Sequence, residues 1–523
     1  MKSFLDRILN YYSLSKEDYD KYYFNAAKED DLLDFNSFQN MSECSTYLKK
    51  LLKEDKKILI YGDYDCDGVV ATSIIFNSIK EYSNKNVGYY IPFREIDGYG
   101  LTTENIDRFH KLGYEIIICV DNGISLIDEI DYLNSLGMEC IIFDHHTPSN
   151  ILPKAKFIIH PEFCTQAKTN MSAGAVCFYF SIAFLGYINK YLLTLASLSI
   201  ISDVMPLVGY NRTLVRLGIS YLNTYKFPQI YSLIAENNEE ITERHFSIFI
   251  SPKINAIGRI CTNNNIFAGV KLFTCDEPDK INYYVSLINK INEQRKSIVE
   301  DATLNIPPVD PDEKIIVLKL NIKEGIAGII AAKLLNKYNI PVVVLCPSTT
   351  RGTIKGSIRS NDGFNCYEAL EYCKDILISY GGHDHAGGLS LKEENFDYLV
   401  KKLNQFLSEC EKNNNTIVVH QDPIPINVGE ISYENYKILR TFAPFGEGHK
   451  VPLFKIENFN TTFLTLSKNR EHIFTKLSLN SALLYFNYDK SILNKEFVDF
   501  FGRLEINNFK GNITAEFIVE DYK

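Results

Sequence analysis

The chain of 523 residues contains no tryptophan, so ring stacking on a planar ligand must use its 33 tyrosines, 33 phenylalanines or ten histidines. Its twelve cysteines form no C-x-x-C pair, which excludes the spacing of a zinc ribbon. No apolar segment of the signal-peptide type follows Met1. We therefore expect a cytoplasmic protein in which the cysteines act as small core residues.

Long apolar runs are also missing. The most apolar region, residues 176–207, is interrupted by Asn189 and Lys190 and contains several Ser and Thr residues. A membrane-spanning helix needs about 20 consecutive apolar residues. We predict buried helices of a soluble protein in this region, and no membrane partner.

Basic residues are outnumbered by acidic ones, 55 to 65, which gives a formal net charge of −10. This balance argues against a protein that coats polyanions in general. An enzyme acting on nucleic acid stays possible, because divalent metal ions and a local basic groove can reverse the field. A hydrophobic fraction of 46% provides for a sizeable core.

The order of expected elements predicts an α/β fold in several domains. Strands at 58–61, 87–91, 115–120, 139–143 and 157–159 alternate with helices and predict a largely parallel sheet. The predicted domains are a helical lead-in at 1–50, this α/β domain at 51–210, a helical connector at 211–310, a smaller α/β domain at 311–411 and a β-rich domain at 412–523.

The second half of the chain predicts two further sheets. In the smaller α/β domain we expect strands at 314–320, 341–346 and 354–360, helices at 328–338, 367–378 and 396–410, and a glycine-rich loop at 379–388. After it, short strands separated by Asn and Gly turns are typical of a small β-barrel. They are expected at 416–420, 453–456, 472–477, 482–486, 497–503 and 513–519.

Three aspartates stand at alternate positions directly after the first strand, in the stretch Tyr61-Gly-Asp-Tyr-Asp-Cys-Asp-Gly68. Ligands of open α/β sheets bind outside the carboxyl ends of the strands. Asp63, Asp65 and Asp67 would repel one another there unless a divalent cation lies between them. The alternative interpretation is an acidic surface turn, since Asp and Gly favour turns.

Further acids and two histidines repeat this placement. Asp121 follows the strand at 116–120, Asp144-His145-His146 follows 140–143, and Asp203 follows a helical segment. Carboxylates with one or two imidazoles suit Mn²⁺ or Mg²⁺ better than Zn²⁺. Two such ions about 4 Å apart can clamp a phosphate during an in-line displacement. Each aspartate taken alone could instead be a turn or N-cap residue.

These motifs resemble the DHH phosphoesterase superfamily, which is named for the sequence Asp144-His145-His146. Additional segments resemble its RecJ branch, the single-stranded-DNA-specific exonucleases. These segments are 63–68, 90–94, 97–101, 120–123, 202–206, 254–259, 324–325, 356–360, 381–383, 444–448 and 452–454. The resemblance implies a DHH domain joined by helices to a DHHA1-like domain and an OB-like domain.

The resemblance also implies a site and an activity. Two Mn²⁺ or Mg²⁺ ions would be held by Asp65, Asp67, Asp121, His145 and Asp203, with Asp63, Asp144 and His146 in or next to the ligand shell. The implied reaction is 5′→3′ release of mononucleotides from single-stranded DNA, in DNA repair and recombination. A single-strand-binding protein and a helicase would be partners by the same resemblance.

Two segments depart from the family pattern. The glycine loop usually reads GGHxxAAG, but here it is Gly381-Gly-His-Asp-His-Ala-Gly-Gly388. Around Glu324 the family commonly has Trp and His, where this chain has Ile322 and Lys323. Neither departure falls on an expected metal ligand, so they concern the binding of the terminal nucleotide and not the reaction class.

Candidate phosphate-binding residues lie mainly in the smaller α/β domain, with others nearer the metal motifs. Glycines let a backbone approach a phosphate closely, and a guanidinium can grip one through two hydrogen bonds. Each could instead be an ordinary surface or core residue. The candidates are His160, Arg259, Ser357, Arg359, Gly381, Gly382 and His383, with His146 beside the metals.

Aromatic residues of the C-terminal domain are candidates for stacking on bases. We expect most of them to fill the interior of the barrel instead. They are Phe442, Phe445, Phe454, Tyr485 and Phe486.

Two other functions stay open. A phosphodiesterase of the same superfamily could act on short oligoribonucleotides or cyclic dinucleotides. A non-catalytic DNA-binding scaffold could keep the fold without the chemistry. The first is less expected because of the apparent third domain, and the second because every acidic position is filled.

Overall fold

The computed structural model describes residues 3–83, 87–166, 170–234, 240–307, 309–310, 313–361, 363–413, 422–509 and 511–523. The chain forms two compact units. One contains Met1–Leu32, Pro206–Arg216 and Val419–Lys523, and the other contains Leu33–Met205 and Leu217–Val418. In the described part of the chain, no helix is both long and apolar enough to cross a membrane.

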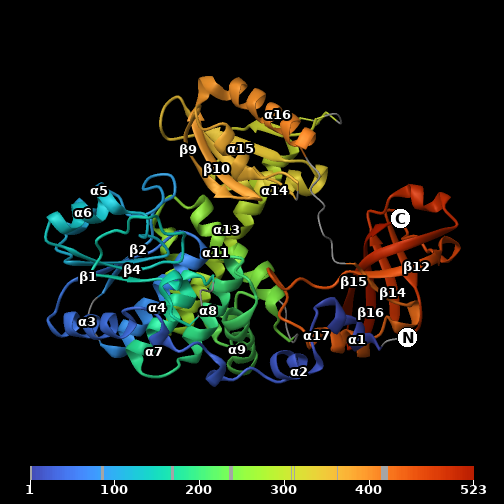
Figure 1. Ribbon diagram of the computed structural model, residues 1–523, viewed down its shortest axis with the longest axis horizontal. Coiled ribbons are helices and arrows are strands. Elements are labelled where there is room, and N and C mark those ends of the chain that lie inside the picture. The colour runs from blue at the N-terminus through green and yellow to red at the C-terminus, as the bar shows by residue number, and fades with distance from the viewer. Residues whose placement is uncertain are drawn as a thin grey trace. The chain divides into compact units, whose positions relative to one another are not determined.

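A five-stranded, fully parallel sheet forms the first half of the larger unit (Figure 1). The strand order is β2-β1-β3-β4-β5. The strands are β1 (Ile58–Tyr61), β2 (Gly88–Tyr90), β3 (Ile116–Val120), β4 (Glu139–Phe143) and β5 (Phe157–Ile159). All five expected strands are therefore present, and the predicted parallel sheet is confirmed.

Helices cover both faces of this sheet, as the buried central strands require. They are α3 (Met41–Lys53), α4 (Cys66–Tyr82), α5 (Thr103–Lys111), α6 (Ile127–Ser135), α7 (Ala173–Leu185) and α8 (Lys190–Ser202). On one face, α5 and α6 bury Phe109 and Leu133 against Tyr61 and Ile142 of the sheet. Residues of α7 and α8 are buried almost all round, which fits the uniformly apolar sequence there.

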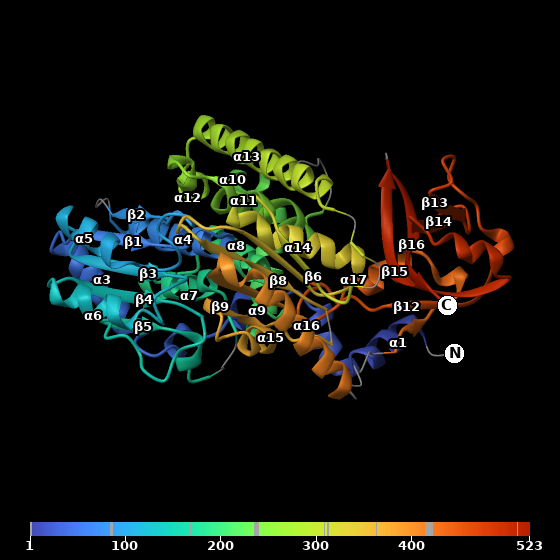
Figure 2. The ribbon, with the colours of Figure 1, turned by 90° about the horizontal axis from the view of Figure 1, so that it is seen from above.

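A helical region follows and connects the two sheets of this unit. Its elements are α10 (Pro228–Tyr231), α11 (Ser251–Ile260), α12 (Ala268–Phe273) and α13 (Pro278–Leu304), with the part of α9 (Gly209–Tyr225) from Leu217 onward, since Pro206–Arg216 belongs to the smaller unit. The long helix α13 is continuous and runs beside α11 and α12 (Figure 2). Pro278 occupies its first turn, where the missing N–H costs no hydrogen bond.

The second sheet of the larger unit is mixed, in the order β6-β7-β8-β10-β9. Its elements are β6 (Ile316–Lys319), α14 (Glu324–Tyr338), β7 (Val342–Pro347), β8 (Thr353–Arg359), α15 (Cys366–Tyr372), β9 (Leu377–His383), β10 (Ala386–Lys392) and α16 (Phe396–Asn413). The small α/β arrangement expected here is therefore present.

One part of that prediction is wrong. Residues 379–388 are not a loop, because β9 and β10 pair antiparallel across them, with Gly382 opposite Gly387. The expected helix at 367–378 also ends early, at Tyr372. Glycine has a low preference for strands, so the local sequence does not predict β9 and β10. The pairing of β10 with the neighbouring strand β8 outweighs that low preference here.

The smaller unit contains a six-stranded sheet in the order β11-β12-β15-β16-β14-β13. Its elements are β11 (Ile424–Pro425), α17 (Tyr433–Arg440), β12 (Phe454–Asn460), β13 (His472–Lys476), β14 (Ser481–Phe486), β15 (Phe497–Phe509) and β16 (Asn512–Tyr522). β-Bulges interrupt the pairing of β12 with β15 and of β15 with β16, which bends the sheet. The strand expected at 416–420 lies outside the described residues.

The first residues of the chain belong to this smaller unit. They form α1 (Phe4–Tyr11) and α2 (Lys16–Tyr19). Phe4 stacks on Phe454 with ring centres 5.7 Å apart, and Ile8 and Leu9 are buried in the same core. From Leu33 the chain belongs to the unit that carries the parallel sheet, and α3 packs there. The boundaries predicted for the individual domains remain predictions.

Candidate metal centre and phosphate site

The carboxyl ends of β1, β3 and β4 meet at one edge of the parallel sheet, because these strands are neighbours in register. The chain runs from β1 to β2 on one side and then to β3 on the other, so a topological switch point lies between β1 and β3. Asp63 follows β1, Asp121 follows β3, and Asp144 follows β4. Asp203, at the C-terminal end of α8, joins them.

Seven of the predicted residues form three overlapping groups, in which single ligand atoms lie within 4.8 Å of one another. The groups are Asp63–Asp65–Asp121, Asp67–His145–Asp203 and Asp121–His145–His146. His145 is central to them. Its Nε2 lies 3.2 Å from an oxygen of Asp121, 3.5 Å from one of Asp203 and 3.7 Å from one of Asp67.

The charges of this cluster are poorly balanced by the protein itself. Burial and the neighbouring carboxylates raise the pKa of Asp63 to about 8 and that of Asp203 to about 9. Burial and the charges of Asp67 and Asp65 also raise the pKa of Asp121 well above its ordinary value. Carboxylates crowded in this way favour the uptake of either protons or cations.

Two buried oxygens point to cations. Among the residues that the structure describes, Oδ1 of Asp63 and Oδ2 of Asp203 have no hydrogen-bond partner. Buried carboxylate oxygens are normally paired, so each orphaned atom needs a ligand. Oxygen donors with one or two imidazole nitrogens are the ligand set of Mn²⁺ and Mg²⁺. The residues present therefore fit two divalent cations.

Two of these acids lie at positions where the backbone is strained. Asp121 has a φ of 62°, a left-handed conformation that Asp tolerates better than most residues, and Gly123 after it has a φ of 116°. Val204, directly after Asp203, has a φ of 54°, which is unfavourable for a β-branched residue. Strain of this kind costs about 1–3 kcal/mol and clusters at functional sites.

Asp144 accepts hydrogen bonds from the protein on both of its oxygens, and its place in or next to the ligand shell stays a prediction. Oδ2 accepts from the backbone N–H of Ile124 at 2.9 Å. Oδ1 accepts from the N–H groups of His145 and His146 and from Nδ1 of His146 at 2.7 Å. Asp144 lies in none of the three groups within the described residues. Its contacts assign it to holding the two histidines.

His146 is oriented by this carboxylate. Burial lowers its pKa, but the hydrogen bond and charge of Asp144 raise it more, to about 9. Tyr99, which the sequence reasoning did not select, places its hydroxyl 3.2 Å from Nε2 of His146. The segment 97–101 carried the signal for it, since two glycines flank the tyrosine and both have positive φ.

His160 is buried and supports the site from behind. Its Nδ1 accepts from the N–H of Glu162 at 3.1 Å, which leaves Nε2 as the donor to the carbonyl of His146 at 2.8 Å. Both ring nitrogens are thus engaged with backbone. These contacts let His160 shape the loop of His146, and the substrate contact predicted for it stays a prediction.

Basic residues gather beside the metal centre. Burial, together with the nearby charges of Arg94 and Arg359, lowers the pKa of Arg259 to about 10. Arg94 lies over the ring of Tyr64, with its guanidinium carbon 4.1 Å from the ring centre. Its Nε has no hydrogen-bond partner among the described residues. Such a cluster suits a phosphate.

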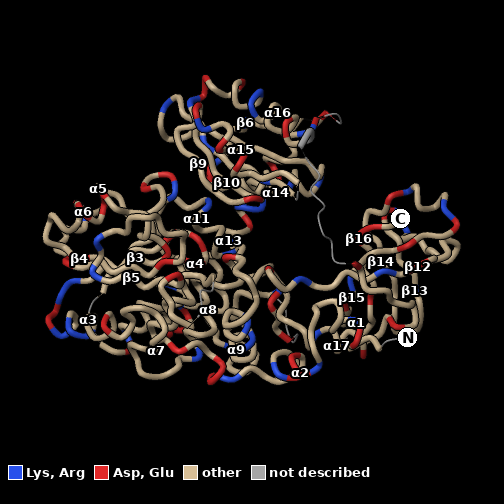
Figure 3. The backbone as a smooth tube through the Cα atoms, viewed as in Figure 1, with Lys and Arg blue, Asp and Glu red and all other residues tan. Residues whose placement is uncertain are grey.

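Arg94 was missed as a site residue, although it belongs to the segment 90–94 that carried the family resemblance. Arg359 and Ser357, both predicted, share one face of β8, with Arg359 Nη1 3.4 Å from the Ser357 hydroxyl. Figure 3 shows that Lys and Arg are otherwise interspersed with Asp and Glu along the whole chain. The site is therefore a local basic cluster and not part of a basic face.

The predicted glycine and histidine contacts lie on a hairpin. Gly381, Gly382 and His383 belong to β9, and His383 is exposed. A side chain at Gly382 would come within 2.3 Å of the carbonyl of Ala386, so only glycine fits this close strand pairing. His383 and Arg359 both pair with Ala386 of β10, one from each neighbouring strand, and the substrate role of the three residues stays a prediction.

Helix α11 packs against the first aspartate motif, residues 61–68. The side-chain oxygen of Asn255 accepts from the N–H of Cys66 at 2.8 Å. A Cβ on Gly258 would lie 2.1 Å from the carbonyl of Tyr64, so the helix can lie against the motif only because residue 258 is glycine. Arg259 donates to the carbonyl of Gly325, at the start of α14, at 2.9 Å.

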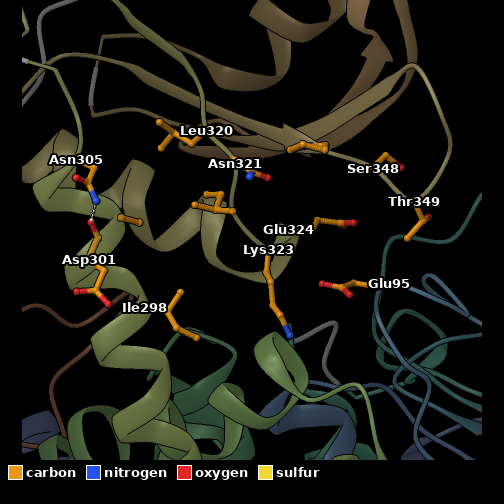
Figure 4. Close-up of a pocket in the computed structure, with 13 residues that line it drawn as sticks. Glu95, Ile298, Asp301, Asn305, Leu320, Asn321, Lys323, Glu324, Ser348 and Thr349 are labelled. Carbon is orange, nitrogen blue, oxygen red and sulfur yellow. Dashed lines mark hydrogen bonds between the residues drawn. The ribbon is translucent and has the colours of Figure 1, made fainter.

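A cavity of about 810 Å³ lies nearby, between the end of α13, the start of α14 and the turn after β7 (Figure 4). Three carboxylates line it, from Glu95, Asp301 and Glu324. Lys323 is its one lining cation and donates to the carbonyl of Ile260 at 2.9 Å. This acidic lining makes the cavity unsuited to phosphate, in contrast to the arginine cluster.

As expected, most of the aromatic candidates of the C-terminal unit lie in or against its core. Phe442 and Phe454 are fully buried in its core, and Phe445 and Tyr485 pack against that core. Phe486 is 55% exposed and lies beside His472. Of the five, only Phe486 presents most of its ring to solvent.

Three family models match this chain. They are described as the DHH family N-terminal domain over residues 57–200, the DHHA1 domain over 312–409 and the RecJ OB domain over 424–521. The matches follow the order of the parallel sheet, the mixed sheet and the C-terminal sheet.

Curated relatives share most of this chain. The single-stranded-DNA-specific exonuclease RecJ of Bacillus subtilis is 29% identical over 95% of the chain, and the RecJ of Escherichia coli is 26% identical over 94%. The chain spans 65% of the length of the Bacillus protein and 91% of that of the Escherichia coli protein.

Solved structures share the fold. The Thermus thermophilus RecJ crystal structure with Mn²⁺ is similar over 99% of this chain and 76% of its own, with a TM-score of 0.83 and 23% identity. A crystal structure of exonuclease RecJ bound to manganese is similar over 72% of this chain and 97% of its own, with a TM-score of 0.61 and 26% identity.

Proposed function

We propose that this chain, whose three matched domains resemble those of the RecJ proteins of the DHH family, is a metal-dependent exonuclease that hydrolyses single-stranded DNA in the 5′→3′ direction to mononucleotides. The observation that supports the proposal most is that a metal cage and a group of arginines lie in the same unit. A cage of six carboxylate and imidazole side chains around His145 lies beside three arginines. Cleavage of a phosphodiester next to a bound phosphate requires both.

The cage would hold two Mn²⁺ or Mg²⁺ ions. Asp63, Asp65 and Asp121 form one group of donors, and Asp67, His145 and Asp203 form another. Bound there, such ions supply a water of lowered pKa and neutralise charge that develops on the phosphate. The repelling carboxylates and the two orphaned oxygens support this assignment.

The protein's own side chains position the substrate. His146 is fixed by Asp144, and its ring is 45% exposed, so it can donate a hydrogen bond to an oxygen of the scissile phosphate. Arg94, Arg259 and Arg359, with Ser357, would hold a second phosphate one nucleotide away. Such charge-assisted contacts fix the strand in register with the cage.

We assign the 5′→3′ polarity to the arginine cluster. A terminal phosphate carries more charge than one within a strand, and a cluster of three half-buried cations would select for it. If that phosphate is the 5′ terminus, the cage meets the next phosphodiester, and a mononucleotide is released. This ordering also places the enzyme in DNA repair and recombination, where 5′ ends are resected.

Partners and location complete the proposal. A single-strand-binding protein and a helicase would supply the single strand, and the exposed ring of Phe486 supports contact of the C-terminal unit with bases. All twelve cysteines are free thiols, and nine of them are buried. Free thiols in this number favour a reducing compartment such as the cytoplasm.

Digestion of end-labelled strands tests the proposal. Strands labelled at the 5′ or the 3′ end, single or duplex, are incubated with Mn²⁺, Mg²⁺ or a chelator. We expect early release of labelled mononucleotide from the 5′ end of single strands, and only with metal. First release from the 3′ end would contradict the polarity, and hydrolysis of a dinucleotide in preference to a long strand would favour the oligonucleotide phosphodiesterase.

Matched variants connect that activity to the cage. Asp65→Asn removes a charge from the cage and should abolish release. Asp131→Asn removes a charge from the surface, where Asp131 pairs with Lys154, and should leave it unchanged. Equal activity of the two variants would refute the proposed site.

A further inference from the structure

Asp67 is the most completely enclosed acid of the cage. Its side chain is 1% exposed. Oδ2 accepts from the N–H of Ala173 at 2.8 Å, and Oδ1 accepts from the N–H of Gly174 at 2.8 Å and from the hydroxyl of Ser199. Oδ2 is also the oxygen that lies 3.7 Å from Nε2 of His145. Oδ1 thus accepts from two protein donors, and Oδ2 accepts from one and lies on the side of His145.

Two helices meet at this carboxylate. Ala173 and Gly174 are the first residues of α7, where unpaired N–H groups and the helix dipole favour an anion. Ser199 lies on α8, one turn before Asp203, and its carbonyl accepts the N–H of Asp203 at 3.0 Å. Ser199 therefore contacts one acid of the cage through its side chain and another through its backbone.

The direction of the hydrogen bonds follows from counting donors. An ionised Asp67 only accepts, so the Ser199 hydroxyl donates to it. Ser172, which caps α7, accepts from the N–H of Ala175, and its hydroxyl lies 2.5 Å from that of Ser199. Ser172 must then donate to Ser199. The result is a chain of buried hydrogen bonds that runs from the N–H of Ala175 through the hydroxyls of Ser172 and Ser199 to Asp67.

The approach of the two helices depends on a glycine. A Cβ on Gly174 would lie 2.4 Å from the Ser199 hydroxyl, so no larger residue leaves room for it. Both serines are fully buried. Burying two hydroxyl groups is unfavourable unless their hydrogen bonds are complete, and here they are complete only through Asp67.

We propose that Ser199 is a positioning residue. Its hydroxyl accepts from Ser172, which caps the first turn of α7, and donates to Oδ1 of Asp67. This bond fixes Asp67 to the protein and leaves Oδ2 toward the metal site. This inference rests on the proposed metal-dependent function. Partners behind a ligand fix its orientation and contribute to metal affinity. Without Ser199, the carboxylate can rotate and lose its fixed donor geometry.

Titration calorimetry with Mn²⁺ alone, without DNA, tests the proposal. Ser199→Ala should weaken binding at one site by about 10- to 100-fold. The Mn²⁺ concentration for half-maximal nuclease activity should rise, while KM for DNA stays unchanged. The control is Ser181→Ala on α7, a fully buried serine whose hydroxyl bonds only within its own helix, to the carbonyl of Phe178. Ser199→Thr, which keeps the hydroxyl, should restore affinity.

Circular dichroism establishes that each variant is folded. Unchanged Mn²⁺ affinity in folded Ser199→Ala would overturn the proposal, as would equal losses in Ser199→Ala and Ser181→Ala. If Ser199→Ala does not fold, Ser172→Ala decides, since it breaks the relay one step earlier and should still weaken Mn²⁺ binding. Two-site Mn²⁺ binding without any nuclease activity would instead refute the proposed function and leave the role of Ser199 intact.

Discussion

Nδ1 of His146 lies 2.7 Å from Oδ1 of Asp144, and the same oxygen accepts the backbone N–H of His146. The carboxylate therefore sets both the position and the ring orientation of this histidine. Since both oxygens of Asp144 bind protein donors, its contribution to the reaction passes through the histidines that it holds.

Asp144→Asn should separate catalysis from metal binding. We expect nucleotide release to fall by about 100-fold or more, because the ring of His146 loses its charged partner. Mn²⁺ affinity should fall much less, since Asp144 belongs to none of the three donor groups in the described residues. Single-turnover rates and calorimetry measure the two quantities, with Asp131→Asn as the control. Equal losses in both would return Asp144 to the ligand shell.

Arg359→Ala should remove part of the recognition of a terminal phosphate. A hydrogen bond to a charged group contributes about 1.5–3 kcal/mol, so kcat/KM for 5′-phosphorylated strands should fall about 10-fold or more. Strands with a 5′-hydroxyl should be affected little. Arg351→Ala is the matched control, because Arg351 is an exposed arginine in the turn between β7 and β8. A similar loss on both substrates would argue against a terminal-phosphate site.

Gly258→Ala should disturb the aspartate motif from behind. Alanine is favoured over glycine in a helix by about 1 kcal/mol, but its Cβ would lie 2.1 Å from the carbonyl of Tyr64. The segment next to Asp65 must then shift, and a displacement of about 1 Å can cost 100-fold in rate. Steady-state kinetics of the folded variant measure this. Gly429→Ala, which fills open space, should behave like the unmodified chain.

The attachment of α1 should depend on pH. Arg7 forms an ion pair with Glu430, which also accepts the N–H of Asn427 at 2.9 Å. Burial raises the pKa of Glu430, but these donors lower it more, so its folded pKa lies below the ordinary value. A depressed carboxylate pKa stabilises the folded state above the unfolded pKa, about 4.3 for Glu, and this stabilisation is lost as the pH falls through the folded pKa.

Hydrogen exchange of residues 4–11 checks this. The protection of α1, corrected for intrinsic rates, should decrease as the pH falls below about 4. In Glu430→Gln it should be lower at neutral pH and change less over the same window. An identical pH dependence in the two proteins would assign the effect to other carboxyl groups.

Local pattern was sufficient for the first sheet and for much of the site. Buried strands of branched residues at 58–61 and 116–120 have no competing conformation, and parallel strands place their carboxyl ends at one edge. Alternating acids after such strands could therefore be assigned to one cluster before any contact was known. The mixed sheet was harder, because the glycines of β9 and β10 form strands only through their neighbours.

The sequence by itself indicated the acids and histidines of the candidate site, because acids at strand ends and the Asp144-His145-His146 motif are local features, but it did not indicate Arg94 or Tyr99. Only the tertiary structure decided how the work is divided among them. It turned Asp144 toward the histidines, brought Arg94 to Arg259 and Arg359, set Ser199 behind Asp67, and packed the first 32 residues with the C-terminal sheet. Each of these depends on partners far apart in the chain. The local pattern of residues does not determine which of the two oxygens of a carboxylate accepts from a distant donor.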